Sequence, residues 1–386
     1  MKAIPLVKEK TTLGVSLICA MAFASALISG CGKGSSFSLL SQSDTFTQSA
    51  GVTNSKADIL WVIDNSGSME SSQSNVVNNL NSFIQDFSTK NLDFKMAVTS
   101  TDAYKEIFNG NTKCSQFRDG ILNSSCNTVN GRTYSGERIL SPLTLNLTSV
   151  FLINASLTDS ANNLFGSGDE RAFQSIKQAL NSTLNAGFLR TDSFLSIIIV
   201  SDEDDFSHDN SSLNENYNSS LMHPIDTYVT YLDSVTGSTP TNRRYNVNAM
   251  AIFDTTCQTF LNTSFTGRKI GVRYGQLIDA VNTAFPNVES QGLKTSLCGN
   301  FADDLNNIAQ NILSLSSRFN LNRIPIESTI TIQINGVSVP NRDTNPLADG
   351  GWVYESATNS ILFVGAYIPA SGSSINIHYD PVAYGI

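Results

Sequence analysis

The stretch FLSIIIVSDEDD, residues 194–205, decides the fold. Residues 194–200 are apolar on both faces, which is typical of a strand in the centre of a parallel sheet with helices on both sides. Asp202 comes two residues after this run. Because ligands of such sheets bind beyond the carboxyl ends of the strands, Asp202 is a candidate binding residue.

A second stretch, ILWVIDNSGSM at residues 59–69, has the same design. An apolar run stops at Asp64, and hydroxyls follow at Ser66 and Ser68. In an extended loop these three side chains can point to one side, and Gly67 lets the backbone turn tightly. Either acid alone would be explained by a strand surfacing into a solvated turn. Two acids at two strand ends instead indicate a shared site.

Strands and helices alternate over most of the chain, which predicts an α/β, doubly wound, mostly parallel sheet with right-handed crossovers. Further strands are expected at 94–98 and 247–253, and helices at 76–87, 172–184, 225–232 and 301–315. Residues 105–140 are rich in Gly and Asn and contain two cysteines, which suggests a long loop insertion.

The pattern changes near the carboxyl end. The segment STITIQINGVSV, residues 328–339, alternates strictly and breaks at Asn335 and Gly336, a dipeptide typical of hairpins. Short strands are also expected at 352–354, 361–364 and 375–379. We therefore predict a small all-β module at residues 321–386.

The amino-terminal residues have the features of an export signal. A basic start is followed by an apolar segment at 13–28, which is short for a membrane-spanning helix. Its end, LISGC at 27–31, resembles a bacterial lipobox, which implies cleavage of a lipoprotein signal peptide (1–30) and lipidation of Cys31. Gly32 resembles the pattern sent on to the outer membrane of Gram-negative-type bacteria. Residues 31–56, rich in Ser, Gly, Thr and Gln, are expected to be a flexible tether from this membrane anchor.

Charge and cysteine content narrow the function classes. The net charge of −9 and the lack of a basic run after residue 10 argue against nucleic-acid binding. Without the signal-peptide cysteine and Cys31, the remaining cysteines are even in number, which favours disulfides in an exported chain. We favour the pairs Cys114–Cys126 and Cys257–Cys298. Zinc on the four thiols is the alternative, although the sequence has no C-x-x-C pair.

Residues 57–318 resemble the von Willebrand factor A-type domains that contain a metal-ion-dependent adhesion site. The motif D-x-S-x-S is present as Asp64, Ser66 and Ser68, and the acid after the central strand is Asp202. The resemblance places a third ligand in GSGDERAFQ, where Ser167 stands at the usual threonine position and Glu170 competes for the role.

This resemblance implies a divalent cation and a protein partner. Oxygen ligands of this kind suit Mg²⁺ first, with Mn²⁺ or Ca²⁺ as alternatives. In the resembled family, an acidic side chain of a protein ligand often takes the free coordination position. The following acids Asp204, Asp205 and Asp209 could hold a second cation or form a solvated acidic loop.

The resulting functional hypothesis is a lipid-anchored envelope protein that binds a protein ligand through a metal. The alternative is a structural or assembly scaffold of the envelope in which the metal holds loops together. We do not expect an enzyme, because the sequence lacks the G-x-S-x-G, H-E-x-x-H and P-loop motifs of hydrolases.

Overall fold

The computed structural model describes residues 42–47, 56–88, 92–121, 126–127, 133–156, 166–191, 193–211, 216–264, 267–285, 291–345, 348–369 and 373–382. Cys31 and the expected signal peptide lie outside the described residues. Among the described residues, no helix combines the length and the apolarity that crossing a membrane requires.

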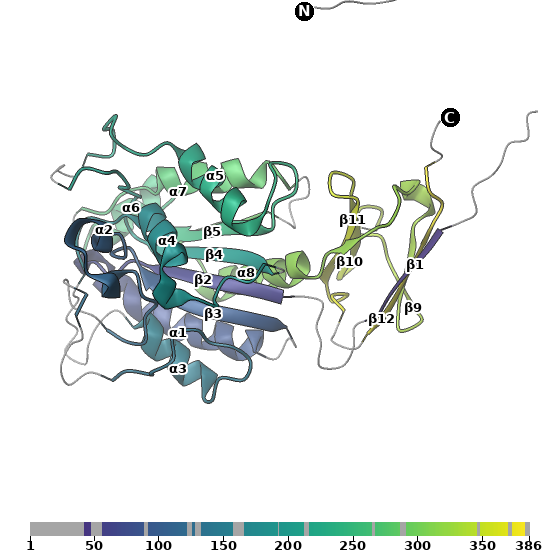
Figure 1. The fold of residues 1–386 in the computed structure, drawn as a ribbon, viewed down its shortest axis with the longest axis horizontal. Coiled ribbons are helices and arrows are strands. Elements are labelled where there is room, and N and C mark those ends of the chain that lie inside the picture. The colour runs from purple at the N-terminus through teal and green to yellow at the C-terminus, as the bar shows by residue number, and fades with distance from the viewer. Residues whose placement is uncertain are drawn as a thin grey trace, which may run out of the picture. The chain divides into compact units, whose positions relative to one another are not determined.

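A five-stranded parallel sheet forms the larger part of the described structure, and Figure 1 shows its long strands side by side. Its strand order is β3-β2-β4-β5-β6. The strands are β2 (Lys56–Ile63), β3 (Asp93–Ser100), β4 (Phe194–Ser201), β5 (Tyr245–Ala251) and β6 (Lys294–Ser296). Every residue of β4 is buried, as its two apolar faces predict. The predicted α/β class is confirmed.

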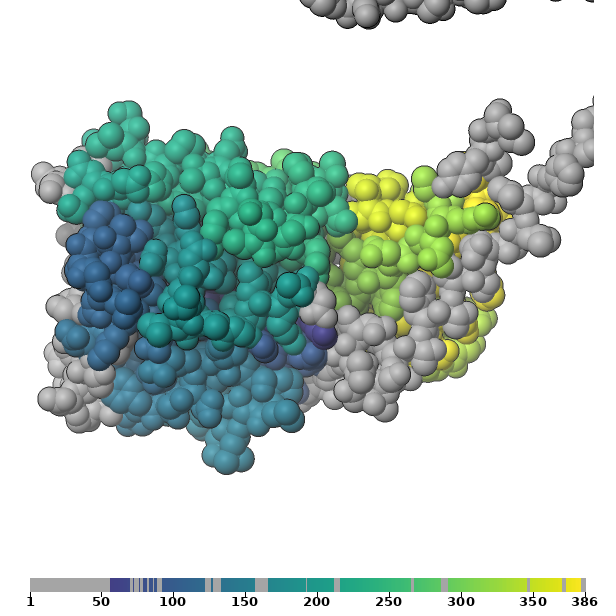
Figure 2. Space-filling model, in the orientation of Figure 1, coloured from purple at the N-terminus to yellow at the C-terminus, as the bar shows by residue number. Residues whose placement is uncertain are grey.

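Helices cover both faces of this sheet. One face packs against α1 (Glu70–Phe87), α3 (Leu147–Ala155), α6 (Thr255–Leu261) and α8 (Phe301–Ser316). The other packs against α4 (Ala172–Asn181), α5 (Ile225–Thr236) and α7 (Val272–Asn282). In the space-filling view the teal and green helices hide almost all of the strands (Figure 2). The short helix α2 (Lys105–Asn109) follows β3.

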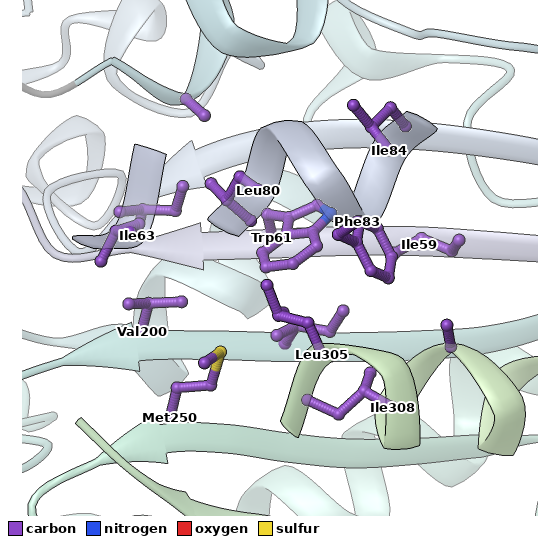
Figure 3. Packing of buried hydrophobic residues seen from close by; sticks show 14 of the residues in the cluster. Ile59, Trp61, Ile63, Leu80, Phe83, Ile84, Val200, Met250, Leu305 and Ile308 are labelled. Carbon is purple, nitrogen blue, oxygen red and sulfur yellow. The ribbon is translucent and has the colours of Figure 1, made fainter. Parts of the chain in front are cut away.

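Trp61 is the largest side chain in the first of these cores. Figure 3 shows it between the α1 side chains and the rest of β2, and its ring meets that of Phe83 edge-on at 5.3 Å between centroids. Leu305 and Ile308 of α8 approach the same sheet face from beside α1 (Figure 3). Burying this much apolar surface fixes β2 in the sheet, and with it the loop that β2 delivers.

The parallel register brings two loops together at one edge of the sheet. Ile63 pairs with Val200, so Asp64 leaves β2 beside Ser201 and Asp202. The amide N–H of Asp64 still donates to the carbonyl of Val200 (2.9 Å). The position of Asp64 is therefore set by the sheet rather than by a free loop.

The carboxyl-terminal strands form two small antiparallel sheets rather than one. The first has the order β10-β11-β7, with β7 (Phe319–Asn320), β10 (Gly350–Glu355) and β11 (Ser360–Gly365). The second has the order β1-β12-β8-β9, with β8 (Thr331–Ile334), β9 (Val337–Val339) and β12 (Ser374–Tyr379). Asn335 and Gly336 form the expected hairpin turn, each with a positive φ.

Strand β1 (Gln42–Thr47) departs from the expected tether. It pairs antiparallel with β12, from Gln42 opposite Tyr379 to Thr47 opposite Ser374. Strand pairing uses backbone groups, so a polar sequence that resembles a linker can still complete the edge of a sheet. Part of the expected tether is therefore a strand of the carboxyl-terminal module.

Both favoured disulfides are present, Cys114–Cys126 and Cys257–Cys298. The first lies in the expected insertion at 105–140, which also contains α2 and a bridge from Met96 to Leu140. The second joins α6 to the turn between β6 and α8. The side chain of Asp254 caps α6 by accepting from the N–H of Cys257 (2.8 Å), which fixes the direction of that helix.

Candidate metal centre

The loop after β2 is folded by its own side chains. The carboxylate of Asp64 accepts a hydrogen bond from the N–H of Ser66 (2.8 Å), a turn that aspartate favours. A short 3₁₀ helix, Gly67–Met69, then leads directly into α1. This compact geometry turns the hydroxyls of both serines towards the same point.

A chain of hydrogen bonds joins this loop to the loop after β4. The hydroxyl oxygens of Ser66 and Ser68 are 2.8 Å apart, and that of Ser68 donates to Asp202 (2.7 Å). A second link runs from the hydroxyl of Ser201 to Asp64 (2.7 Å). The structure thus brings together the four residues from two loops that the sequence analysis placed in one site.

The third loop approaches the first through its backbone. The N–H of Gly166 donates to the carbonyl of Asn65 (2.9 Å), and a Cβ at position 166 would lie 2.0 Å from that oxygen. Only glycine permits this approach. The loop that carries Ser167 and Glu170 is therefore held beside the D-x-S-x-S loop.

Ser167 is turned away from the other candidate ligands. Its hydroxyl accepts from the N–H of Asp169 (3.2 Å), and its own N–H donates to Asp102 (3.3 Å). Asp102 in turn accepts from the side chain of Asn65 (3.0 Å) and forms an ion pair with Lys105 (2.9 Å). In this structure Ser167 helps to position the loop.

Glu170 lies on the inner side of the same loop. Its side chain is fully buried, and no described residue donates a hydrogen bond to either carboxylate oxygen. Burial raises its pKa well above the usual range, and the nearby carboxylates of Asp64 and Glu203 add to this rise. An unpaired buried carboxylate is costly, so Glu170 is the group in the third loop that most needs a cation.

The two conserved-position acids of the motif, Asp64 and Asp202, show the same electrostatic strain. Burial, and then repulsion from Asp202, raise the pKa of Asp64 to about 7. Burial also raises the pKa of Asp202, although hydrogen bonds from Ser68 and Arg268 oppose the rise. The site therefore holds more negative charge than its surroundings neutralise.

One basic residue, Arg268, was not anticipated from the sequence. Its buried guanidinium donates from Nε to Asp202 (2.6 Å) and from Nη2 to the carbonyl of Ser68 (2.6 Å). No local motif surrounds Arg268 in the sequence. It lies in the segment after α6, and only the fold brings it to this edge of the sheet.

The residues present fit a hard divalent cation. Carboxylates and serine hydroxyls are the oxygen donors that such ions prefer. Within the described part of the chain, no three side chains of the types His, Cys, Asp and Glu converge to hold a metal by themselves. A cation at this edge would therefore depend on the hydroxyls of Ser66 and Ser68 as well as on the acids.

The acidic run after Asp202 is not the solvated loop that the sequence suggested. Asp204 and Asp205 are both buried, and protein groups satisfy them. Asp204 accepts from the N–H of Arg273 (2.9 Å), and Asp205 accepts from its guanidinium (3.1 Å). Asp209 alone is exposed, at 87% of its side chain. A run of acids can be buried where a single arginine and several N–H groups face it.

No family model and no curated protein match the sequence. Among solved structures, the chain is similar to the pilus adhesin SpaC from Lactobacillus rhamnosus GG in its open conformation (TM-score 0.40, 12% identity, 88% of this chain and 42% of the adhesin). It is also similar to a von Willebrand factor type A protein from Catenulispora acidiphila (TM-score 0.36, 11% identity, 91% and 68%). A third is proximal thread matrix protein 1 from the mussel byssus, with a zinc-occupied MIDAS motif (TM-score 0.34, 11% identity, 72% and 52%). The chain thus spans less than half the length of the pilus adhesin.

Proposed function

We propose that residues 57–318 are a von Willebrand factor A-type domain that binds a protein ligand through a divalent cation. The observation that carries the proposal is the convergence of Asp64, Ser66, Ser68 and Asp202 beside the unpaired carboxylate of Glu170. Oxygen atoms from three loops meet at the carboxyl edge of a parallel sheet, where ligands of such folds bind. Mg²⁺ is the cation of choice, with Mn²⁺ or Ca²⁺ as alternatives.

Each residue has a separate role in this proposal. Asp64 and Asp202 supply negative charge, and the two serine hydroxyls supply neutral oxygens. Glu170 takes the part that the family resemblance gives to Ser167, because its carboxylate is buried and unpaired whereas the hydroxyl of Ser167 is engaged with Asp169. A bound cation would provide a Lewis-acidic position for an acidic side chain of the ligand.

We also propose that the protein works at a membrane surface. The lipobox-like LISGC segment implies a lipid on Cys31, placed in the outer membrane of a Gram-negative-type envelope. A protein held in this way would present a binding domain rather than catalyse a reaction. Metabolic labelling with a fatty acid tests the anchor, because Cys31→Ser should abolish both labelling and signal-peptide cleavage.

One observation favours a scaffold as the second candidate function. Asp64, Asp202 and Glu170 are all fully buried, and both motif serines are buried as well. A cation enclosed in this way would hold three loops together without meeting a ligand. In that case metal would stabilise the fold, and no partner would bind through it.

The two functions are separated by metal and partner binding in one set of variants. We expect millimolar Mg²⁺ or Mn²⁺ to raise the melting temperature of the purified chain and to permit EDTA-reversible binding to envelope or host extracts. Asp64→Ala should abolish both effects, and Asp209→Ala, which changes an exposed acid in a neighbouring loop, should abolish neither. A metal-dependent rise in melting temperature without EDTA-sensitive binding would favour the scaffold. No effect of either metal would refute the proposed site.

A further inference from the structure

Arg268 places a permanent positive charge inside the candidate metal centre. Its side chain is fully buried, as is that of its partner Asp202. Besides Asp202, its guanidinium reaches the carbonyls of Ser68 (2.6 Å) and Leu261 (2.5 Å). One residue thus joins the loops after β2 and β4 to the end of α6.

The segment that carries Arg268 is held firmly in this position. Its backbone carbonyl accepts from the side chain of Gln258 in α6 (2.8 Å), and its N–H donates to the side chain of Asn262 (3.3 Å). The next residue, Lys269, donates its N–H to the carbonyl of Asp202 (3.1 Å). The disulfide between Cys257 and Cys298 anchors α6 itself. The guanidinium is therefore a fixed part of the site.

The charges at the site explain why such a group would be needed. Asp64, Asp202 and Glu170 bring three carboxylates, one more than a site whose third loop supplies a neutral hydroxyl. With a divalent cation alone, the three carboxylates leave an excess negative charge, which repels an acidic ligand. The charge of Arg268 removes that excess. Asp102 does not alter the balance, because Lys105 pairs with it.

We propose that Arg268 is the residue that lets this site accept an anionic ligand, because it offsets the charge that Glu170 adds. The inference rests on the proposed function, and it makes the two residues a compensating pair. It predicts opposite effects on two kinds of ligand. Loss of Arg268 should favour the cation and disfavour the anion, and loss of the Glu170 charge should do the reverse.

The test uses Arg268→Gln, Glu170→Gln and the double variant in the full chain, with Mn²⁺ and acetate as probes. Titration calorimetry gives the Mn²⁺ affinity, and water-proton relaxation of bound Mn²⁺ reports acetate. We expect Arg268→Gln to bind Mn²⁺ roughly tenfold more tightly and to bind acetate more weakly. Glu170→Gln should bind Mn²⁺ more weakly and acetate more tightly. The double variant, whose net charge equals that of the wild type, should move both affinities back towards wild-type values.

A merely structural role for Arg268 gives a different pattern. In that case Arg268→Gln would weaken Mn²⁺ and acetate together, and the double variant would be weaker still, which would overturn the proposal. If Arg268→Gln does not fold, Glu170→Gln decides, because it keeps the arginine: weaker binding of both probes would contradict the charge balance. Failure of the wild type to bind Mn²⁺ would instead refute the metal site itself, and this inference with it.

Discussion

Strand β2 has a buried aspartate near each end, and the two have opposite kinds of partners. Asp58, near the amino end, accepts from the guanidinium of Arg190 (2.8 Å), from the N–H of the same residue (2.7 Å) and from the hydroxyl of Ser193. Asp64, just past the carboxyl end, accepts from the N–H of Ser66 and the hydroxyl of Ser201, which are both neutral.

The pKa values of the two carboxyls reflect this difference. Burial raises both, but the contacts of Asp58 with Ser193 and Arg190 oppose the rise. For Asp64, repulsion from Asp202 adds to the effect of burial. A fold that supplies its own cation for one buried aspartate, and none directly to the other, has built the first as structure and left the second for an external ion.

The largest expected effect is at the amino end. Asp58→Asn should destabilise the protein by about 3–5 kcal/mol, because it leaves the guanidinium of Arg190 in a mostly buried position without its partner. The loss should be the same with and without Mg²⁺. Chemical denaturation in EDTA and in Mg²⁺ measures it, and a loss that appears only in Mg²⁺ would contradict the structural role.

The same substitution at the other end should behave in the opposite way. In EDTA, Asp64→Asn should leave stability unchanged or raise it, because it removes a carboxylate that Asp202 repels. In Mg²⁺ it should lose the stabilisation that the cation gives the wild type, about 2.7 kcal/mol at a hundredfold excess over Kd. Equal destabilisation in both buffers would mean that Asp64, like Asp58, is structural.

The pH dependence sharpens the comparison further. The pKa of Asp64 is raised from 3.8 to about 7, so in the metal-free protein its contribution to stability falls as pH rises through that range. Cation binding requires the ionised carboxylate. We therefore expect the increase in melting temperature caused by Mg²⁺ to be small at pH 5.5 and to grow up to pH 8. Asp64→Asn should show no such growth, and a pH-independent increase in the wild type would contradict this assignment.

The parts of the fold and site that depend on sheet geometry were predictable from the sequence. Apolar runs that end in acids place Asp64 and Asp202 at the same sheet edge, because parallel strands share a direction. Helix α7 was missed, although Tyr274, Leu277, Ile278 and Val281 recur at helical spacing and are all buried. That signal was present in the sequence.

Other features carry no sequence signal of this kind. Arg268 lies 66 residues from Asp202 along the chain, and only tertiary packing joins them. Strand β1 is polar and pairs through its backbone, so composition alone makes it resemble a linker. The choice between Ser167 and Glu170 depends on how the third loop turns after Gly166 meets Asn65. Spacing along the chain does not specify that turn.

The smallest expected effect concerns this third loop. Ser167→Ala should change stability by less than about 1 kcal/mol, because the hydroxyl that it removes only accepts one hydrogen bond, from Asp169, at a half-buried position. Mg²⁺ affinity should remain close to that of the wild type. Glu170→Ala should weaken Mg²⁺ binding strongly, since it removes a buried carboxylate with no other partner among the described residues. Calorimetric titration of both variants decides between them. If Ser167→Ala is the variant that loses the metal, the loop must rotate when the cation binds, and the hydroxyl rather than the carboxylate completes the site.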